Sequence, residues 1–218
     1  MTYLQIVNSV LRRLRETEVE SVTQTTYSKL IGEFVNQTKR EVEDAYNWNA
    51  LTESLTIDTT PELFNYVLTG AGSRLRVIDA YNVTYKTPLE NKSREFLNRV
   101  LFLANQDGSQ KGAPVYYGWN GVDSSGNYQV DLYPIPDATY NLQFNVIIPQ
   151  TELQEDNTVL LVPYEPVVLG AYSKAIRERG EDQGTLGSEV QGQYAAALAS
   201  AVAQENARYP DEAVWYPI

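Results

Sequence analysis

The sequence predicts an α+β fold in which helices from both ends of the chain form one bundle around an inserted, mostly antiparallel β lobe. Apolar residues recur at helical spacing near both ends and alternate with polar residues in the middle. The length of 218 residues fits one domain with an insertion. We expect a helical bundle from residues 1–50 and 160–209, a β-rich lobe with one short helix at 51–159, and a tail at 210–218.

Two helices are predicted near the start of the chain. The first covers about residues 3–15 and begins with a capping box, in which Thr2 and Gln5 can each hydrogen-bond the backbone near the other. The second follows Thr25 or Thr26 and runs to about Tyr46. We assign its charged side chains to the solvent-exposed face: Lys39, Arg40, Glu41, Glu43 and Asp44.

The middle of the chain shows the alternation typical of strands. Strands are expected at about 51–57, 64–68, 75–85, 115–119, 128–132 and 140–146. Pro134 and Pro136 cannot donate to a ladder and interrupt the pattern. Ser93 can cap a short helix that extends to about Leu103.

Helices return near the end of the chain. One begins at about Pro163, and Gly180 is placed to end it. Residues 181–187 read as a linker. A last helix, with Ser188 and Gln191 as a second capping box, runs to about Arg208 and carries a face of alanines.

Charge and residue counts exclude several classes of function. The net charge is −11 with a pI near 4.5, which opposes tight DNA binding because that binding relies on basic side chains. The chain has no Cys and no His, which excludes Cys/His zinc sites, Ser-His-Asp triads and disulfides. Its acidic clusters are interpreted as solvated surface, so we expect no enzyme activity, metal or cofactor. Neither a signal peptide nor a transmembrane helix is predicted.

Basic and aromatic residues are the candidate interface. The arginines of the first helix form either a solvated face or salt bridges to an acidic neighbouring subunit, and they are Arg12, Arg13 and Arg15. Several aromatic residues fall at strand edges or in the tail, where they can serve protein contacts: Trp119, Tyr209, Trp215 and Tyr216. The alternative for the tail is that it folds back on its own bundle.

The order of these segments resembles the head-to-tail connector, or adaptor, proteins of bacteriophages, including the tail tubular protein A type. The resemblance covers most of the chain. It rests on the opening helix with Leu4, Val7 and Leu11, the second helix ending near Trp48, the strand Leu51–Ile57, the run Leu132–Asp137 followed by Tyr140-x-Leu-x-Phe144, the Val162-Pro163 helix entry, Ala175–Gly180, and the final alanine-rich helix.

The resemblance implies a structural virion protein at the neck, made in the host cytoplasm. It implies a homo-oligomer, usually a twelve-fold ring, that binds the portal protein and a tail, nozzle or tail-terminator protein. DNA would pass through the ring without sequence-specific binding. By the same analogy the C-terminal segment grips the portal, which adds Ile218 to Trp215 and Tyr216 as candidate contacts. The family needs no catalytic residues.

Other functions remain open from the sequence. One is a different neck or tail component, such as a stopper or tail terminator, although those proteins are usually smaller and less helical. Another is a glycan-binding or hydrolytic tail protein whose aromatic residues line a sugar cleft. The last is a cytoplasmic protein unrelated to phages.

Overall fold

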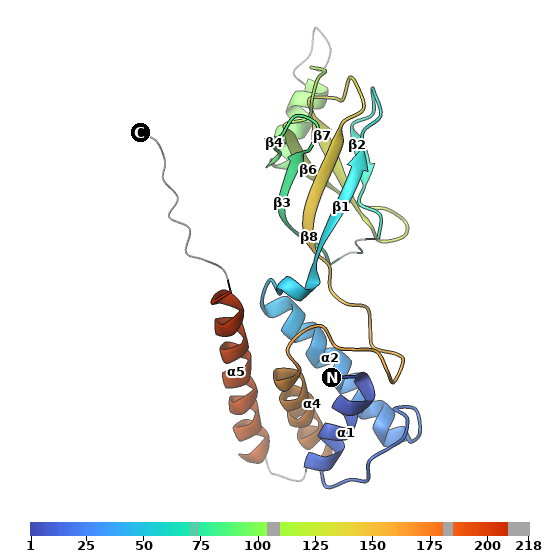
Figure 1. Ribbon diagram of the computed structural model, residues 1–218, viewed down its shortest axis with the longest axis vertical. Coiled ribbons are helices and arrows are strands. Elements are labelled where there is room, and N and C mark those ends of the chain that lie inside the picture. The colour runs from blue at the N-terminus through green and yellow to red at the C-terminus, as the bar shows by residue number, and fades with distance from the viewer. Residues whose placement is uncertain (71, 73, 104–109, 181–184, 209–218) are drawn as a thin grey trace. The chain divides into compact units, whose positions relative to one another are not determined.

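The computed structural model describes residues 1–70, 72, 74–103, 110–180 and 185–208. These residues contain five α-helices and two mostly antiparallel sheets, which confirms the α+β class (Figure 1). The chain divides into two compact units. A helical unit contains Met1–Leu51 and the described residues from Gln150 onward, and a β unit contains Thr52–Pro149.

The predicted helices at the start of the chain are present. Helix α1 (Tyr3–Arg13) begins with the expected capping box between Thr2 and Gln5. Helix α2 (Thr26–Ala45) is capped by Thr25, and its partner in the box is Ser28. After α2, a short 3-10 helix, η1 (Asn49–Leu51), leads out of the helical unit.

The prediction of a fully solvated charged face on α2 was wrong. Lys39 and Glu43 are both buried, and Lys39 Nζ donates to Glu43 Oε1 at 2.9 Å. The two residues are one helical turn apart, so they lie on the same side of the helix. This side faces the returning chain, since Lys39 also donates to the backbone oxygen of Gln150 at 2.6 Å.

Helix α4 (Tyr164–Arg179) is the centre of the helical unit. It contacts α1, α2 and α5 (Thr185–Asn206), and apolar residues are buried around much of its circumference. Gly170 is part of this packing, because a side chain there would collide with Thr38 of α2 and Tyr194 of α5. As predicted, Gly180 ends the helix, in the left-handed conformation that glycine adopts most readily.

The predicted start of the last helix was wrong. Helix α5 is already formed at Thr185, so Ser188 lies inside it and is not its cap. Most of the alanine side chains point away from the buried side of α5, which consists of Gly187, Val190, Tyr194 and Glu205.

The β unit consists of two four-stranded sheets. One has the order β1-β8-β3-β4, with β1 (Thr52–Asp58), β8 (Asn141–Ile147), β3 (Arg76–Asn82) and β4 (Thr87–Pro88). The other has the order β2-β7-β6-β5, with β2 (Asn65–Val67), β7 (Tyr128–Tyr133), β6 (Tyr116–Val122) and β5 (Glu90–Asn91). All pairs are antiparallel except β5 with β6. Ser93 caps α3 (Arg94–Asn98), which continues as a π-helical turn, η2 (Arg99–Leu103).

Both sheets contribute to one apolar core. Tyr66 and Leu132 enter it from one sheet, and Leu142 and Phe144 enter it from the other. The ring of Phe144 meets that of Tyr117 edge-on at 5.3 Å between centroids. The alternation read from the sequence therefore corresponds to side chains that point between the two sheets.

Candidate functional site: an arginine groove and a clamped loop

The end of α1 has an unusual backbone. Arg15 follows the C-cap Leu14 and has a φ of +59°. Its N–H donates to the carbonyl oxygen of Arg12, and the N–H of Glu16 donates to that of Leu11 at 2.9 Å. Glycine is the usual residue at this position, and an L-residue in the left-handed region costs about 1–2 kcal/mol. The sequence therefore places an arginine where the backbone favours glycine.

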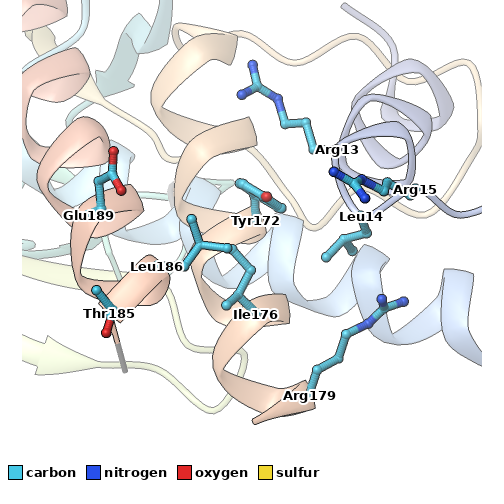
Figure 2. A pocket seen from close by; sticks show the side chains of 9 residues that line it. All are labelled: Arg13, Leu14, Arg15, Tyr172, Ile176, Arg179, Thr185, Leu186 and Glu189. Carbon is cyan, nitrogen blue, oxygen red and sulfur yellow. The ribbon is translucent and has the colours of Figure 1, made fainter. Parts of the chain in front are cut away.

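This turn places Arg13 and Arg15 at a groove within the helical unit, which we call the arginine groove (Figure 2). Its volume is about 700 Å³, and it lies between the end of α1, the second half of α4 and the start of α5. Its lining residues are Arg13, Leu14, Arg15, Tyr172, Ile176, Arg179, Thr185, Leu186 and Glu189. The groove thus combines guanidinium groups with apolar side chains.

The arginines near the groove differ in their partners. Arg179 is held by the Glu16 carboxylate and donates from Nε to the Tyr27 hydroxyl at 2.7 Å. Arg12 forms an exposed ion pair with Glu18 at 3.3 Å. Arg13 and Arg15 have no carboxylate partner among the described residues. In a chain with 17 basic and 28 acidic residues, these two guanidinium groups of one groove are available to an anionic group from outside.

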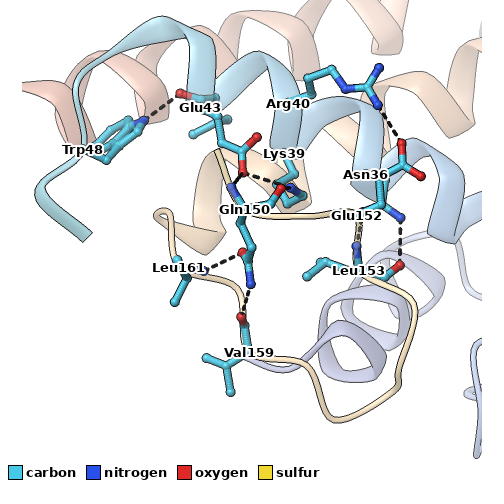
Figure 3. A network of polar contacts seen from close by, with 11 residues as sticks. Asn36, Lys39, Arg40, Glu43, Trp48, Gln150, Glu152, Leu153, Val159 and Leu161 are labelled. Atoms are coloured by element: carbon cyan, nitrogen blue, oxygen red, sulfur yellow. Dashed lines mark hydrogen bonds and ion pairs between the residues drawn. The ribbon is translucent and has the colours of Figure 1, made fainter. Parts of the chain in front are cut away.

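A second polar feature of the helical unit is the loop that precedes α4, residues 150–162, which we call the clamped loop (Figure 3). Asn36 of α2 forms two hydrogen bonds with the backbone of Leu153, at 3.0 and 2.9 Å. The N–H of Gln150 donates to Glu43, and the Gln150 amide bonds the backbone of Val159 and Leu161. The loop therefore has a fixed conformation although it has no regular secondary structure.

The clamped loop carries a concentration of negative charge. Glu152 and Glu155 are exposed, and Glu152 forms a surface ion pair with Arg40 at 2.6 Å. Burial raises the pKa of the Tyr3 hydroxyl to about 12, and the carboxylates of Glu33, Asp156 and Glu152 contribute to the rise. Burial is the main cause of this rise in pKa, and the three carboxylates add to it because they lie close to the Tyr3 end of α1.

The structure places the predicted interface residues in different parts of the molecule. Arg13 and Arg15 both line the groove, whereas Arg12 forms an ion pair with Glu18. Trp119 belongs to β6 in the other unit, where it is half-buried against Tyr117 and Tyr128. The remaining candidates lie outside the described residues: Tyr209, Trp215, Tyr216 and Ile218.

The sequence did not indicate Arg179, Leu186 or the clamped loop as parts of a surface. Arg179 and Leu186 are more than 160 residues from Arg15 in the chain, and no local pattern connects them. For the loop the sequence offered one signal, because Val159 and Leu161 follow Glu152 and Glu155 within ten residues in a segment without helical or strand periodicity.

Within the described ranges, no group of three or more Asp and Glu side chains is arranged to hold a metal ion. No helix in this part of the chain is both long and apolar enough to cross a membrane. Arginine is enriched in protein–protein interfaces, and the groove is lined by Arg13, Arg15 and Arg179.

Comparison with protein families identifies the chain. The family described as SU10 adaptor protein matches residues 1–215. The chain belongs to the SU10 adaptor family. This membership confirms the resemblance to phage head-tail adaptor proteins and makes the chain a bacteriophage adaptor, a structural component of a virion that interacts with other virion proteins. Among curated proteins, none matches significantly.

Proposed function

We propose that this SU10 adaptor is the subunit of a head-to-tail connector ring that joins the portal protein to the tail. The ring is twelve-fold, lies at the neck of the virion and encloses the DNA channel. The observation that carries the proposal is the match of the adaptor family to residues 1–215, nearly the full length of the chain. The portal lies on one side of the ring, and a tail, nozzle or tail-terminator protein lies on the other.

The charge of the chain supports a channel role. With a net charge of −11, the subunits give a ring whose field repels DNA phosphates. A wall of this kind lets DNA pass during packaging and ejection without holding it, because tight binding requires basic side chains that displace counterions from the phosphates.

The helical unit supplies surfaces for contacts between subunits. A ring requires two different complementary faces on each subunit. The arginine groove belongs to one of them. On α5, Thr185 and Glu189 of the groove wall continue at intervals of three and four residues into exposed Gly192, Ala196 and Ala199, so this small-residue surface lies on the same side as the groove.

Contacts with the portal and tail are assigned to aromatic residues. Trp119 of the β unit is half-buried, so part of its ring is available to a partner. The C-terminal residues Tyr209, Trp215, Tyr216 and Ile218 are proposed to grip the portal, since Tyr and Trp combine apolar area with a polar group and are enriched in interfaces. None of these roles requires catalysis.

The decisive experiment measures the mass of the purified full-length protein by light scattering, first alone and then with the portal protein of the same phage. The proposal expects a ring of about a dozen subunits, or a monomer that binds the portal in the same stoichiometry. A variant ending at Arg208 is the control for tail-dependent binding. A chain that stays monomeric and ignores the portal contradicts the connector function.

A further inference from the structure

The arginine groove has the chemistry of a docking site for an acidic segment that also carries apolar side chains. Arg13 and Arg15 lack a carboxylate partner among the described residues. The apolar part of the lining includes the buried Ile176 of α4 and Leu186 of α5, which is 43% exposed. Charge-assisted hydrogen bonds from arginine favour a carboxylate, and the apolar lining favours a neighbouring aliphatic side chain.

The clamped loop has the complementary chemistry. Glu152 and Glu155 are exposed, and Glu155 has no ion-pair partner in the described part of the chain. The same loop exposes two aliphatic side chains, Val159 at 55% and Leu161 at 47%. Carboxylates and uncovered aliphatic groups within one short segment match the arginines and leucines of the groove.

The loop of one chain cannot reach the groove of the same chain. The N–H groups of Tyr3 and Leu4 donate to Thr158 and Asp156 at 2.9 and 3.1 Å, which fixes the loop to the first turn of α1. Arg13 and Arg15 lie at the other end of this 11-residue helix, about 16 Å away at 1.5 Å per residue. A contact between loop and groove therefore requires two copies.

We propose that the clamped loop of one copy occupies the arginine groove of the next copy, so that this contact closes the ring. The inference rests on the proposed function and names the two faces that meet. Glu152 and Glu155 bind Arg13 and Arg15, while Val159 and Leu161 cover the exposed Leu186. Because loop and groove are different surfaces, the contact is head-to-tail and each subunit binds two neighbours.

The loop is suited to this role because its conformation is set before binding. Asn36 and Glu43 fix its backbone from the α2 side, and Gln150 bonds two other backbone groups within the loop, as Figure 3 shows. Ordering a free loop on association opposes binding, and a preformed loop avoids that cost. The ion pair of Glu152 with Arg40 is exposed on both sides, so exchanging partners loses little.

Charge reversal tests the pairing. One variant carries Arg13→Glu with Arg15→Glu, and the other carries Glu152→Lys with Glu155→Lys. Each alone is expected to weaken self-association at least tenfold in sedimentation velocity. An equimolar mixture, or a chain with all four changes, is expected to restore assembly, because the reversed loop fits the reversed groove. The matched controls Lys29→Glu and Glu53→Lys, at exposed positions elsewhere, are expected to assemble normally.

Cysteine cross-linking gives a second readout that also detects weak or transient contact. The chain has no native cysteine, so Val159→Cys and Leu186→Cys introduce the only thiols. Under mild oxidation, in concentrated free protein or on the portal, the chain with both changes is expected to form a ladder of multimers. The pair Val159→Cys with Lys29→Cys, at an exposed position outside the groove lining, is the control. An absent ladder in both settings, or an equal ladder from the control pair, overturns the proposal.

Other outcomes separate this inference from the connector function. If the wild-type protein assembles but neither charge reversal affects assembly, the pairing is wrong and the connector function stands. If groove variants assemble normally but lose another virion protein, that protein occupies the groove and the pairing is again wrong. If the wild-type protein neither assembles nor binds the portal, the connector function has failed, and this is seen before any variant is made.

Discussion

The helical unit fixes its irregular segments with buried charged side chains and half-buried amide side chains, whereas the β unit relies on strand pairing around an aromatic and aliphatic core. In the former, Lys39, Glu43 and Glu205 are buried, and Glu205 accepts from the N–H of Asn49 at 2.9 Å. In the latter, the core cluster contains apolar and aromatic residues from both sheets, and the buried polar exceptions are Thr59, Asn82 and Asp131. The helical unit therefore uses polar contacts to hold the clamped loop in one conformation. A recognition surface requires such a fixed conformation.

The largest loss of stability is expected from breaking the buried ion pair between Lys39 and Glu43. Glu43→Ala leaves the Lys39 ammonium buried without a counter-ion and should cost about 3–5 kcal/mol of unfolding free energy. Trp48 is buried in the same unit and donates to the Val42 carbonyl, so its fluorescence in a Trp119→Phe, Trp215→Phe background reports urea unfolding there. The double change Lys39→Met with Glu43→Leu is the comparison and should cost less than Glu43→Ala, because it leaves no unpaired buried charge and only the backbone groups of Gln150 lose their partners. A loss below about 1 kcal/mol for Glu43→Ala would show that the charges are not a buried pair.

The change in the β unit that corresponds to Glu43→Ala in the helical unit is Leu132→Ala. Leu132 is fully buried between the sheets, so the truncation leaves a cavity and should cost about 3 kcal/mol. Trp119 fluorescence in a Trp48→Phe, Trp215→Phe background follows this unit. The exposed Val122→Ala in β6 is the control and should change stability by less than about 0.5 kcal/mol. Equal losses of stability from Leu132→Ala and Val122→Ala would contradict the burial of Leu132 and the exposure of Val122.

Loosening the clamped loop is expected to have an intermediate effect. Asn36→Ala removes both hydrogen bonds to the Leu153 backbone and should cost about 1–3 kcal/mol. Amide hydrogen exchange should increase in residues 150–162 and stay unchanged in the β strands. Exchange that rises equally in both units would mean that Asn36 stabilises the whole chain and does not act on the loop.

The sequence predicted the parts of the fold that follow local rules. The caps at Thr2, Thr25 and Ser93 and the stop at Gly180 were confirmed, because each depends on residues within one turn of the helix end. The capping box at Ser188 failed because the same pattern occurs inside helices, where the backbone N–H groups are already bonded.

Features that depend on tertiary contacts could not be predicted in this way. Charged residues on a helix are usually solvated, so nothing local distinguished Lys39 and Glu43 from Arg40 and Glu41. Their burial depends on Gln150, which is more than 100 residues away. Of the candidate site, the sequence predicted Arg13 and Arg15 but not the groove wall from α4 and α5, for the same reason.

The titration of Tyr3 should lower the free energy of unfolding, but only at high pH. The pKa of Tyr3 is about 12 in the folded chain against 10 ordinarily, so its stabilising contribution is complete below pH 10 and is lost as pH rises to 12. The expected loss is up to about 2 kcal/mol. Tyr3→Phe should make the fall shallower. Some fall should remain in this variant because of Tyr140. The hydrogen bond from Tyr140 to Asp137, together with burial, also raises the pKa of Tyr140 to about 12. An unchanged profile in Tyr3→Phe would contradict the shift.

The smallest expected change in stability has the opposite sign. Arg15→Gly relieves the left-handed backbone at φ +59° and should stabilise the helical unit by about 0.5–1 kcal/mol, since glycine adopts this conformation without steric cost. The same change removes a guanidinium group from the arginine groove, so self-association should weaken while urea resistance rises. The control is Arg12→Ala, where an exposed ion pair is lost and both quantities should stay nearly constant. If Arg15 were retained only to complement the end of α1, its replacement would leave assembly unchanged. A gain in stability together with a loss of assembly would show that the strained turn is retained for contact with a partner.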